Sequence, residues 1–280
     1  MAVEISVWGA RGSIPYGTVD TSLFGSNTSC VSVKTAHQTI IFDAGTGIVG
    51  LGEALRQAHV KNIDIVISHP HLDHLIGLPF FSPLYEADVT IHLWSARRNA
   101  LSDTKSMISE FIREPYFPIG IDQWAAKVSF HTFEDGQELG LAAGMSSGMT
   151  MSTCRLNHPG GCTGYRFECE DGVFCYLPDF ERDDGSFDAA TIEFLNGCDL
   201  ALVDATYTPE DYEEHRGYGH NHWRAAGELC AKADVKAWKL FHHAHLRTDA
   251  ELLAIERLAQ SEFPNCAASR EGDIYHLGCS

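Results

Sequence analysis

The stretch SHPHLDH, residues 68–74, places three histidines and an aspartate directly after an apolar run, IDIVI. In an extended chain, side chains alternate between the two faces, so His69, His71 and Asp73 would point to one side. A turn within the stretch would then bring His74 beside Asp73. Imidazole and carboxylate groups bind zinc, and four of them within one turn begin two metal sites without completing them. The sequence therefore predicts a metal site with further ligands elsewhere in the chain.

Polar residues also stand at the ends of other predicted strands. His158 and Asp179 follow apolar runs, and Asp204 and His242 each close one. In layered α/β proteins, a cleft at the carboxyl ends of strands is the usual place for a ligand. We expect these residues and the SHPHLDH stretch to meet in one cleft.

Strand and helix patterns extend along the whole chain. Alternating or apolar runs bounded by turn residues predict strands at 4–8, 30–35, 39–43, 64–68, 89–94, 127–133, 149–156, 164–170, 173–177, 199–204, 237–242 and 273–277. Helical periodicity is found at 48–58, 97–113, 186–196, 222–233 and 249–260. Because the strands form two batches that are each followed by helices, we expect two packed sheets flanked by helices in a single domain, 1–280.

Composition narrows the functional class. Acidic side chains outnumber basic ones by 38 to 20, which gives a net charge of −18 and disfavours binding to long nucleic acid. No apolar run approaches the roughly 20 residues that cross a bilayer, and the start of the chain lacks a signal-peptide pattern. The nine cysteines are scattered without a CxxC pair. We expect a cytoplasmic protein with no membrane partner.

The pattern H-x-H-x-D-H after an apolar strand resembles the signature of the metallo-β-lactamase fold superfamily of metallohydrolases. Four further motifs resemble those of the family: FDAGTG at 42–47, NHPGGCTGY at 157–165, YLPD at 176–179 and LFHH at 240–243. The resemblance covers most of the chain. It implies an α/β fold, the four-layer αββα sandwich.

Carried across by position, the resemblance implies two metal ions. One would be held by His69, His71 and His158, the other by Asp73, His74 and His242, with Asp179 bridging both. At the last motif, His243 and His245 are alternatives to His242, and the L-x-H pattern selects His242. The alternative for the distant residues is a solvated loop or surface position. The ligand set suits zinc, although manganese, iron and cobalt accept mixed histidine and carboxylate sites.

Two such ions can turn a bridging water into hydroxide, which Asp73 would help to orient, and neutralise the oxyanion that forms. Thioesters, lactones, β-lactams and phosphodiesters are all attacked in this way. LVDAT at 202–206 and GHNHW at 219–223 resemble the acidic residue and glycine-histidine helix start of tRNase Z and related phosphodiesterases. Here Asp204 would orient His220, which would protonate the departing alkoxide.

The GHNHW motif has a structural role as well. We expect Asn221 to cap the following helix, with Trp223 packed beneath it. His222, two positions after His220, is a candidate substrate contact, although its position favours an orientation away from the site.

The glycine-rich stretches WGARGSIP at 8–15 and FGSNTSCVSV at 24–33 resemble the branch that includes phosphoribosyl cyclic phosphodiesterases and cyclic nucleotide phosphodiesterases. Ser13, Asn27 and Thr28 would add hydrogen bonds at the edge of the site. The basic arm with which tRNase Z grips tRNA has no counterpart. A dinuclear phosphodiesterase for small cyclic phosphodiesters is therefore the expected function, and a lactone or thioester hydrolase and a non-catalytic metal carrier are the alternatives.

The segment 97–124 combines an amphipathic pattern with aromatic residues. Phe111, Tyr116, Phe117 and Trp124 would cover the cleft and stack on a base, as aromatic faces do for nucleotides. The alternative is a helix that covers a sheet or forms a homodimer contact.

Overall fold

The computed structural model describes residues 3–36, 38–98, 103–141, 148–183 and 185–278, and contains two mixed β-sheets. The first sheet has the order β13-β1-β2-β3-β4-β5-β6. Its strands are β1 (Glu4–Gly9), β2 (Cys30–Lys34), β3 (Thr39–Phe42), β4 (Asn62–Ile67), β5 (Thr90–Ala96), β6 (Lys127–Phe133) and β13 (Ile274–His276). The second has the order β12-β11-β10-β9-β8-β7. Its strands are β7 (Thr150–Leu156), β8 (Cys162–Cys169), β9 (Gly172–Leu177), β10 (Leu200–Asp204), β11 (Ala237–Phe241) and β12 (Cys266–Ala268).

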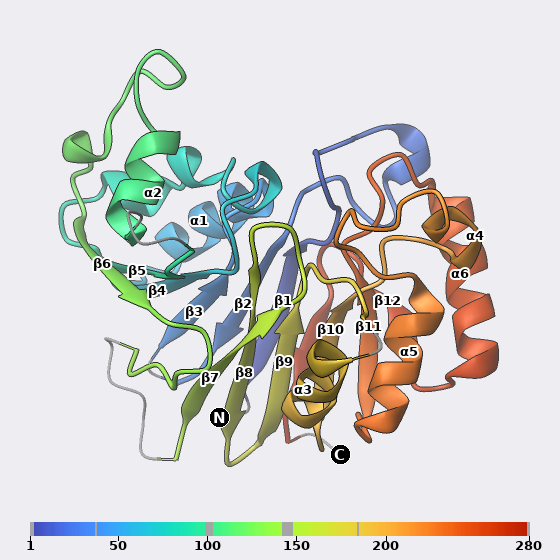
Figure 1. The fold of residues 1–280 in the computed structure, drawn as a ribbon. Helices are drawn as coiled ribbons and strands as arrows, with labels where there is room; N and C mark the ends of the chain where they lie inside the picture. Colours follow the sequence, from blue (N-terminus) through green and yellow to red (C-terminus); the bar gives the residue numbers. More distant parts are fainter. Residues whose placement is uncertain (1–2, 37, 99–102, 142–147, 184, 279–280) are drawn as a thin grey trace.

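Helices cover the outer face of each sheet (Figure 1). The first sheet is covered by α1 (Gly47–Gln57) and α2 (Thr104–Phe111). The second is covered by α3 (Ser186–Leu195), α5 (Trp223–Lys232) and α6 (Asp249–Glu262), and a short helix, α4 (Pro209–Tyr212), lies in a loop.

Three buried apolar cores hold these layers together. One lies between the two sheets and includes Phe42, Tyr165 and Phe241. The other two lie between each sheet and its helices, around Ile48 in one case and around Trp238 in the other. Burial of such cores is the main force that stabilises stacked layers. The expected four-layer αββα sandwich is confirmed.

The strand directions gather the polar loops at one edge. Strands β3 to β6 run parallel to one another, as do β9 to β12. Strand β7 runs antiparallel to β8, which is antiparallel to β9, so β7 shares the direction of β9. The loops that follow β7, β9, β10 and β11 therefore leave the second sheet on the same side, and the histidines that follow β4 lie beside residues of these loops.

Every strand expected from the sequence has a counterpart, but two short elements were not predicted and one predicted helix needs correction. Strand β12 and helix α4 are three and four residues long, too short for a periodic pattern. The helix expected at 97–113 begins only at Thr104, because the Asp103 side chain accepts a hydrogen bond from the Ser106 amide at 2.7 Å and caps it there. Residues 99–102 of that prediction lie outside the described residues.

None of the described helices combines the length and the apolarity that spanning a membrane requires.

Candidate metal centre

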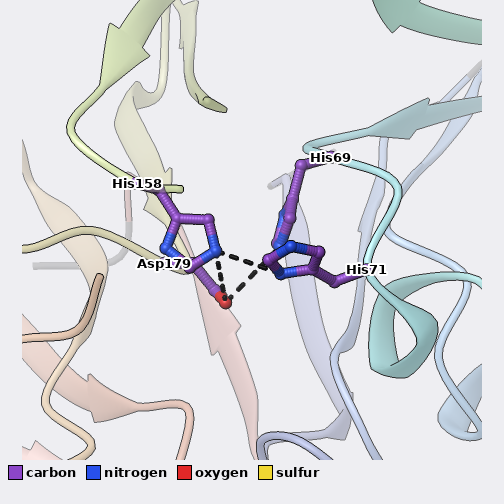
Figure 2. A group of neighbouring side chains, drawn as sticks. All are labelled: His69, His71, His158 and Asp179. Carbon is purple, nitrogen blue, oxygen red and sulfur yellow. Dashed lines mark hydrogen bonds and ion pairs between the residues drawn. The ribbon is translucent and has the colours of Figure 1, made fainter. Parts of the chain in front are cut away.

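Three overlapping groups of possible metal ligands lie at the common edge of the sheets, and the third of them consists of Asp179, Asp204, His220 and His242. The first group consists of His69, His71, His158 and Asp179, whose ligand atoms lie within 4.8 Å of one another. Figure 2 shows that these four side chains converge on one point, with Asp179 between the histidines. The second group consists of Asp73, His74 and His242, whose ligand atoms meet the same limit.

Asp179 connects the first two groups because each of its oxygens faces one of them. Its Oδ2 lies 3.6 Å from His69 Nε2 and 3.9 Å from His158 Nε2. Its Oδ1 lies 3.2 Å from His74 Nε2 and 3.4 Å from His242 Nε2. A carboxylate in this position can bridge two cations, as the resemblance implied.

Asp73 completes the second group from the opposite side. Its Oδ2 lies 3.0 Å from His242 Nε2 and 3.4 Å from His74 Nε2. Neighbouring His243 takes no part, since its Nε2 bonds to the Ser269 carbonyl at 2.8 Å. The structure thus brings His242, and not His243, to the cluster.

The second ring nitrogen of most of these histidines has a fixed partner. His69 Nδ1 lies 3.0 Å from Ser68 Oγ, and His74 Nδ1 lies 2.7 Å from Asp43 Oδ2. The Nδ1 of His158 donates to the Gly219 carbonyl at 2.7 Å. Such outer partners fix the tautomer and aim the remaining nitrogen at the metal. In all three residues, Nε2 is the nitrogen left for a ligand.

Three buried polar atoms in the cluster lack a hydrogen-bond partner: His69 Nε2, His74 Nε2 and Asp179 Oδ1. A buried polar atom without a partner costs about 1 to 3 kcal/mol, so such atoms rarely occur together by accident. Cations bound by both groups would satisfy all three. The donor set, imidazole and carboxylate, suits divalent ions of the zinc type. The residues present therefore fit two metal ions.

The charge states of the cluster also favour cations. Burial lowers the pKa of each histidine in the first group, which keeps these ligands neutral. Burial alone would raise the pKa of Asp179, but the facing His242 and His74 hold it well below its usual range. For His74, burial opposes the charged form, yet Asp179 and Asp73 raise its pKa well above the usual value. The carboxylates around the second group thus favour a positive charge there. Either a proton on His74 or a bound metal cation can supply that charge.

His220 lies beside both groups and is held by a buried carboxylate. Its Nδ1 lies 2.8 Å from Asp204 Oδ2, and its ring lies 4.8 Å from that of His242. Burial alone would lower the pKa of His220, but the charge and hydrogen bond of Asp204 raise it to about 9. Because Nδ1 donates to Asp204, the other nitrogen, Nε2, remains for a substrate.

Asp204 is itself fixed by the surrounding backbone. It is fully buried and accepts hydrogen bonds from the Phe180 amide at 3.1 Å and the Thr206 amide at 3.0 Å. The Thr206 hydroxyl also lies 2.8 Å from Asp204 and 3.1 Å from His242 Nδ1. One threonine thus connects the carboxylate that holds His220 with a ligand of the second group.

The residues expected at the edge of the site have mixed positions. Ser13 lies at the cluster, but through its backbone: its amide donates to Asp73 Oδ2 at 2.6 Å. The Asn27 side chain instead donates to Glu271 at 2.7 Å. Thr28 is fully buried, and its hydroxyl accepts from the Thr46 amide at 2.9 Å. The predicted substrate contact through Thr28 is therefore wrong, because its side chain is buried and holds a neighbouring loop, whereas the contact through the half-buried Asn27 stays a prediction.

The expected roles of Asn221 and His222 are corrected as well. His222 is the N-cap of α5, with its Nδ1 accepting from the Ala225 amide at 3.2 Å, so this nitrogen is not available to a substrate. Asn221 is buried, and its Oδ1 accepts from the Arg182 amide at 3.0 Å. His222, and not Asn221, thus caps the helix, and Asn221 holds the backbone at Arg182 instead.

The aromatic residues of 97–124 mostly pack inward. Phe111 and Phe117 lie against the core under α1 and α2, and Trp124 is buried in it. Tyr116 is 76% exposed, with the Arg113 guanidinium 5.8 Å from its ring centre. The half-buried ring of Phe117 packs edge-on against Phe80, and its stacking on a base stays a prediction.

Asp43 is the residue of the site to which the sequence patterns gave no role. It is fully buried with φ +61°, and its carboxylate accepts from the Ser68 amide at 2.7 Å and from Tyr176 Oη at 2.9 Å. It also holds His74, as described above. Its place in FDAGTG, directly after a buried strand, is the signal that could have identified it.

The sequence of the chain is similar to a known protein family and to individual members of it. Residues 38–243 match the Beta-lactamase superfamily domain. A ribonuclease Z of Natronomonas pharaonis is 22% identical over 311 aligned positions, which cover 94% of each chain. A ribonuclease Z of Picrophilus torridus is 35% identical over 80 residues, which are 29% of this chain and 25% of that protein.

Solved structures show the same fold across nearly the whole chain. The metallo-beta-lactamase fold protein YhfI from Bacillus subtilis superposes with a TM-score of 0.74 at 15% identity, covering 99% of this chain and 100% of its own. A diphosphatase from the PhnP family gives 0.68 at 18% identity, with 98% and 97% covered. The short form of human tRNase Z gives 0.67 at 15% identity, with 98% and 100% covered. The chain therefore belongs to the beta-lactamase superfamily and has the metallo-β-lactamase fold.

Proposed function

We propose that this protein is a dinuclear metal-dependent phosphodiesterase that opens small cyclic phosphodiesters, such as cyclic nucleotides or phosphoribosyl cyclic phosphates. The observation that carries the proposal is His220, held by the buried Asp204 and placed next to both ligand groups. Zinc is the favoured metal because the ligands are mainly imidazoles.

The proposed chemistry divides between metals and side chains. Two bound divalent ions would withdraw charge from the phosphoryl oxygens and lower the pKa of an attacking water. Asp73, fixed by the Ser13 amide at 2.6 Å, would orient that water. His220 would give the proton on Nε2 to the departing ribose oxygen, and Asp204 would stabilise the ring in the required tautomer. An alkoxide leaves poorly without that proton, so this side chain matters most for a phosphodiester.

Substrate size is argued from charge. With 38 acidic and 20 basic residues, the chain lacks the excess of lysine and arginine that binds an RNA backbone. Two cations would add about four positive charges at the cluster, enough for one compact phosphate. RNA is the second candidate substrate, because a curated relative matched over 94% of its length is a ribonuclease Z.

Two alternatives lead to different results at His220. A thioester hydrolase with the same metals would expel a thiolate, which leaves well as an anion, and in a lactone hydrolase attack on the carbonyl carbon is the slow step. Loss of His220 would therefore change the rate of either one little. A metal carrier would bind ions without turnover. Both can be separated from the proposal by a panel of substrates.

The panel tests the purified protein reconstituted with zinc or with manganese. It contains 3′,5′-cyclic and 2′,3′-cyclic nucleotides, a 1,2-cyclic phosphoribosyl compound, a tRNA precursor, p-nitrophenyl acetate and a lactone, each with and without chelator. Chelator-sensitive hydrolysis of a cyclic diester is the expected result. Cleavage of the tRNA precursor alone would favour the ribonuclease, and hydrolysis of the carbonyl esters alone would favour the rival hydrolase.

Substitution at His220 tests the mechanism. H220A should lower kcat on the cyclic diester by about 100- to 10,000-fold, the usual contribution of a general acid, while metal content stays at two per chain. H276A, at an exposed histidine of β13, is the matched control and should leave both unchanged. Equal loss of metal and of turnover in H220A would contradict a role as proton donor.

A further inference from the structure

A cavity of about 470 Å³ lies directly beside the metal centre. Its wall includes Ser13, whose amide holds Asp73, and Thr206, whose hydroxyl lies 3.1 Å from His242 Nδ1. Tyr207 forms another part, with its ring centre 6.0 Å from that of His220. The volume falls within the roughly 300 to 1,000 Å³ typical of small-molecule sites. A substrate held at the metals would therefore extend into this cavity.

Aromatic rings form one wall of the cavity. Tyr207 and His215 stack with their centres 4.6 Å apart and an angle of 22° between the planes. Tyr218 meets His215 edge-on at 5.4 Å and is 62% exposed, which leaves much of its ring free. The exposed ring of Tyr218 beside the cavity is accessible to a ligand held there. Such rings are what a flat heterocycle stacks on.

The loop that carries this wall is anchored to the metal centre. The Glu181 carboxylate accepts hydrogen bonds from the Gly217 amide at 2.9 Å, the Gly219 amide at 3.0 Å and the Tyr212 hydroxyl at 2.6 Å. Glu181 stands two positions after Asp179, so the strand end that bears the bridging carboxylate also fixes the aromatic loop. A preorganised wall binds its ligand with a smaller loss of entropy.

The charges of the cavity disfavour a second phosphate. Arg247 is the one lysine or arginine among the described residues that line it, and its Nη2 lies 2.5 Å from Asp211. The other guanidinium branch lies 3.9 Å from Glu251. Two carboxylates thus outweigh one guanidinium, and a phosphate would be repelled. The same carboxylates can accept hydrogen bonds from an amino group.

His215 adds an acceptor of fixed orientation. Its Nδ1 donates to the Asp211 carbonyl at 2.7 Å, because a carbonyl oxygen can only accept. In the tautomer that this bond fixes, the other nitrogen, Nε2, is the one that can accept a hydrogen bond. An uncharged ring system with N–H donors complements this wall better than a phosphorylated sugar does.

We infer that this cavity is a nucleobase subsite, and that the substrates are cyclic nucleotides with an amino-bearing base and not phosphoribosyl cyclic phosphates with a second phosphate. This inference rests on the proposed phosphodiesterase function and adds the substrate class to it. The base would stack on Tyr218, with His215 meeting the edge of the base, while the cyclic phosphate reaches the metals.

The test compares a base-bearing with a base-free ligand. Wild type, Y218A, Y218F and H215A are loaded with zinc, and KM is measured for 3′,5′-cyclic AMP and for methyl ribofuranoside 3′,5′-cyclic phosphate. Loss of one stacking ring should raise KM for cyclic AMP about fivefold to a hundredfold in Y218A and leave the base-free ester unchanged. Y218F keeps the ring and should behave as wild type. L258A, at a leucine of α6 that is 58% exposed, is the control of matched exposure.

Equal effects on both ligands, or no effect of Y218A on either, would overturn the subsite. Binding of cyclic AMP, followed by titration calorimetry in the same proteins, separates failure of the subsite from failure of the proposed function. Binding that depends on Tyr218 without hydrolysis would keep the subsite and refute the phosphodiesterase. Hydrolysis that does not depend on Tyr218 would do the opposite.

Discussion

Replacing Asp43 with asparagine should weaken the second metal site without touching a ligand. Asp43 Oδ2 lies at hydrogen-bond distance from three groups: Ser68 Oγ at 2.8 Å, His74 Nδ1 at 2.7 Å and Tyr176 Oη at 2.9 Å. Its Oδ1 accepts from the Ser68 amide at 2.7 Å. In D43N, the oxygen would stay with the Ser68 amide and an NH₂ group would face the other three.

The hydroxyls can rotate to accept from this NH₂ group, but His74 cannot. Its Nδ1 would have to lose the proton, which moves that proton to Nε2, the atom that faces Asp73 and Asp179. A protonated Nε2 cannot bind a metal. A hydrogen bond to a charged group contributes about 1.5 to 3 kcal/mol, which corresponds to roughly 10- to 150-fold in affinity. Loss of an outer partner of a metal ligand costs about 10- to 100-fold, which agrees.

The assay is a zinc titration with a competing chelator, which resolves the two binding steps. D43N should weaken one step by about 10- to 100-fold and leave the other nearly unchanged, because the first group does not contain His74. D64N is the matched control: Asp64 is equally buried, accepts from Trp94 Nε1 at 2.9 Å and lies within β4. D64N should lower the melting temperature and spare both binding steps. Two unchanged steps in D43N would refute the tautomer argument.

Three further variants test the supports of the site. Arg11 is buried and donates to the carbonyls of Gly25 at 2.9 Å and Arg247 at 3.0 Å. Because the lysine of R11K cannot reach both carbonyls, the free energy of unfolding, measured in urea, should fall by about 2 to 4 kcal/mol. A fall below about 0.5 kcal/mol would contradict this role of Arg11. E181Q removes the negative charge that holds the Gly217 and Gly219 amides. Hydrogen–deuterium exchange of the amides in this loop should therefore become at least about tenfold faster. Unchanged exchange would show that the carboxylate does not anchor the loop. Y116A removes a ring that is 76% exposed, so KM for the cyclic diester should stay within twofold, and a larger rise would restore this tyrosine as a substrate contact.

The local patterns of the chain predicted most of the elements and the residues of the metal centre. Buried strands such as β4 are continuous apolar runs, and SHPHLDH follows one of them directly, so the cluster could be read from short stretches. His158 and Asp179 were found in the same way, as polar residues at strand ends. Their meeting point depends on the strands that carry them ending at the same edge of the packed sheets.

The predictions failed where a side chain had a choice of partners. Thr28 is a polar residue in a glycine-rich turn, and nothing in the sequence indicates that Thr46 occupies it. His222 caps α5, although asparagine is the more usual cap, because packing brought its ring to the Ala225 amide.

The sequence by itself determined the fold class, the layered order of the elements and the ligand types, because these follow from short-range periodicity and from the chemistry of each side chain. Only the tertiary structure decided which ring nitrogen of each histidine faces the ligand site and that Asp43 holds His74. It also decided that a cavity with an aromatic wall lies beside the ligand groups. Asp43 and Tyr176 are 133 positions apart and yet in hydrogen-bond contact. Such contacts depend on the register and spacing of two separate sheets, which are set by the packing of the core between them and not by any local pattern.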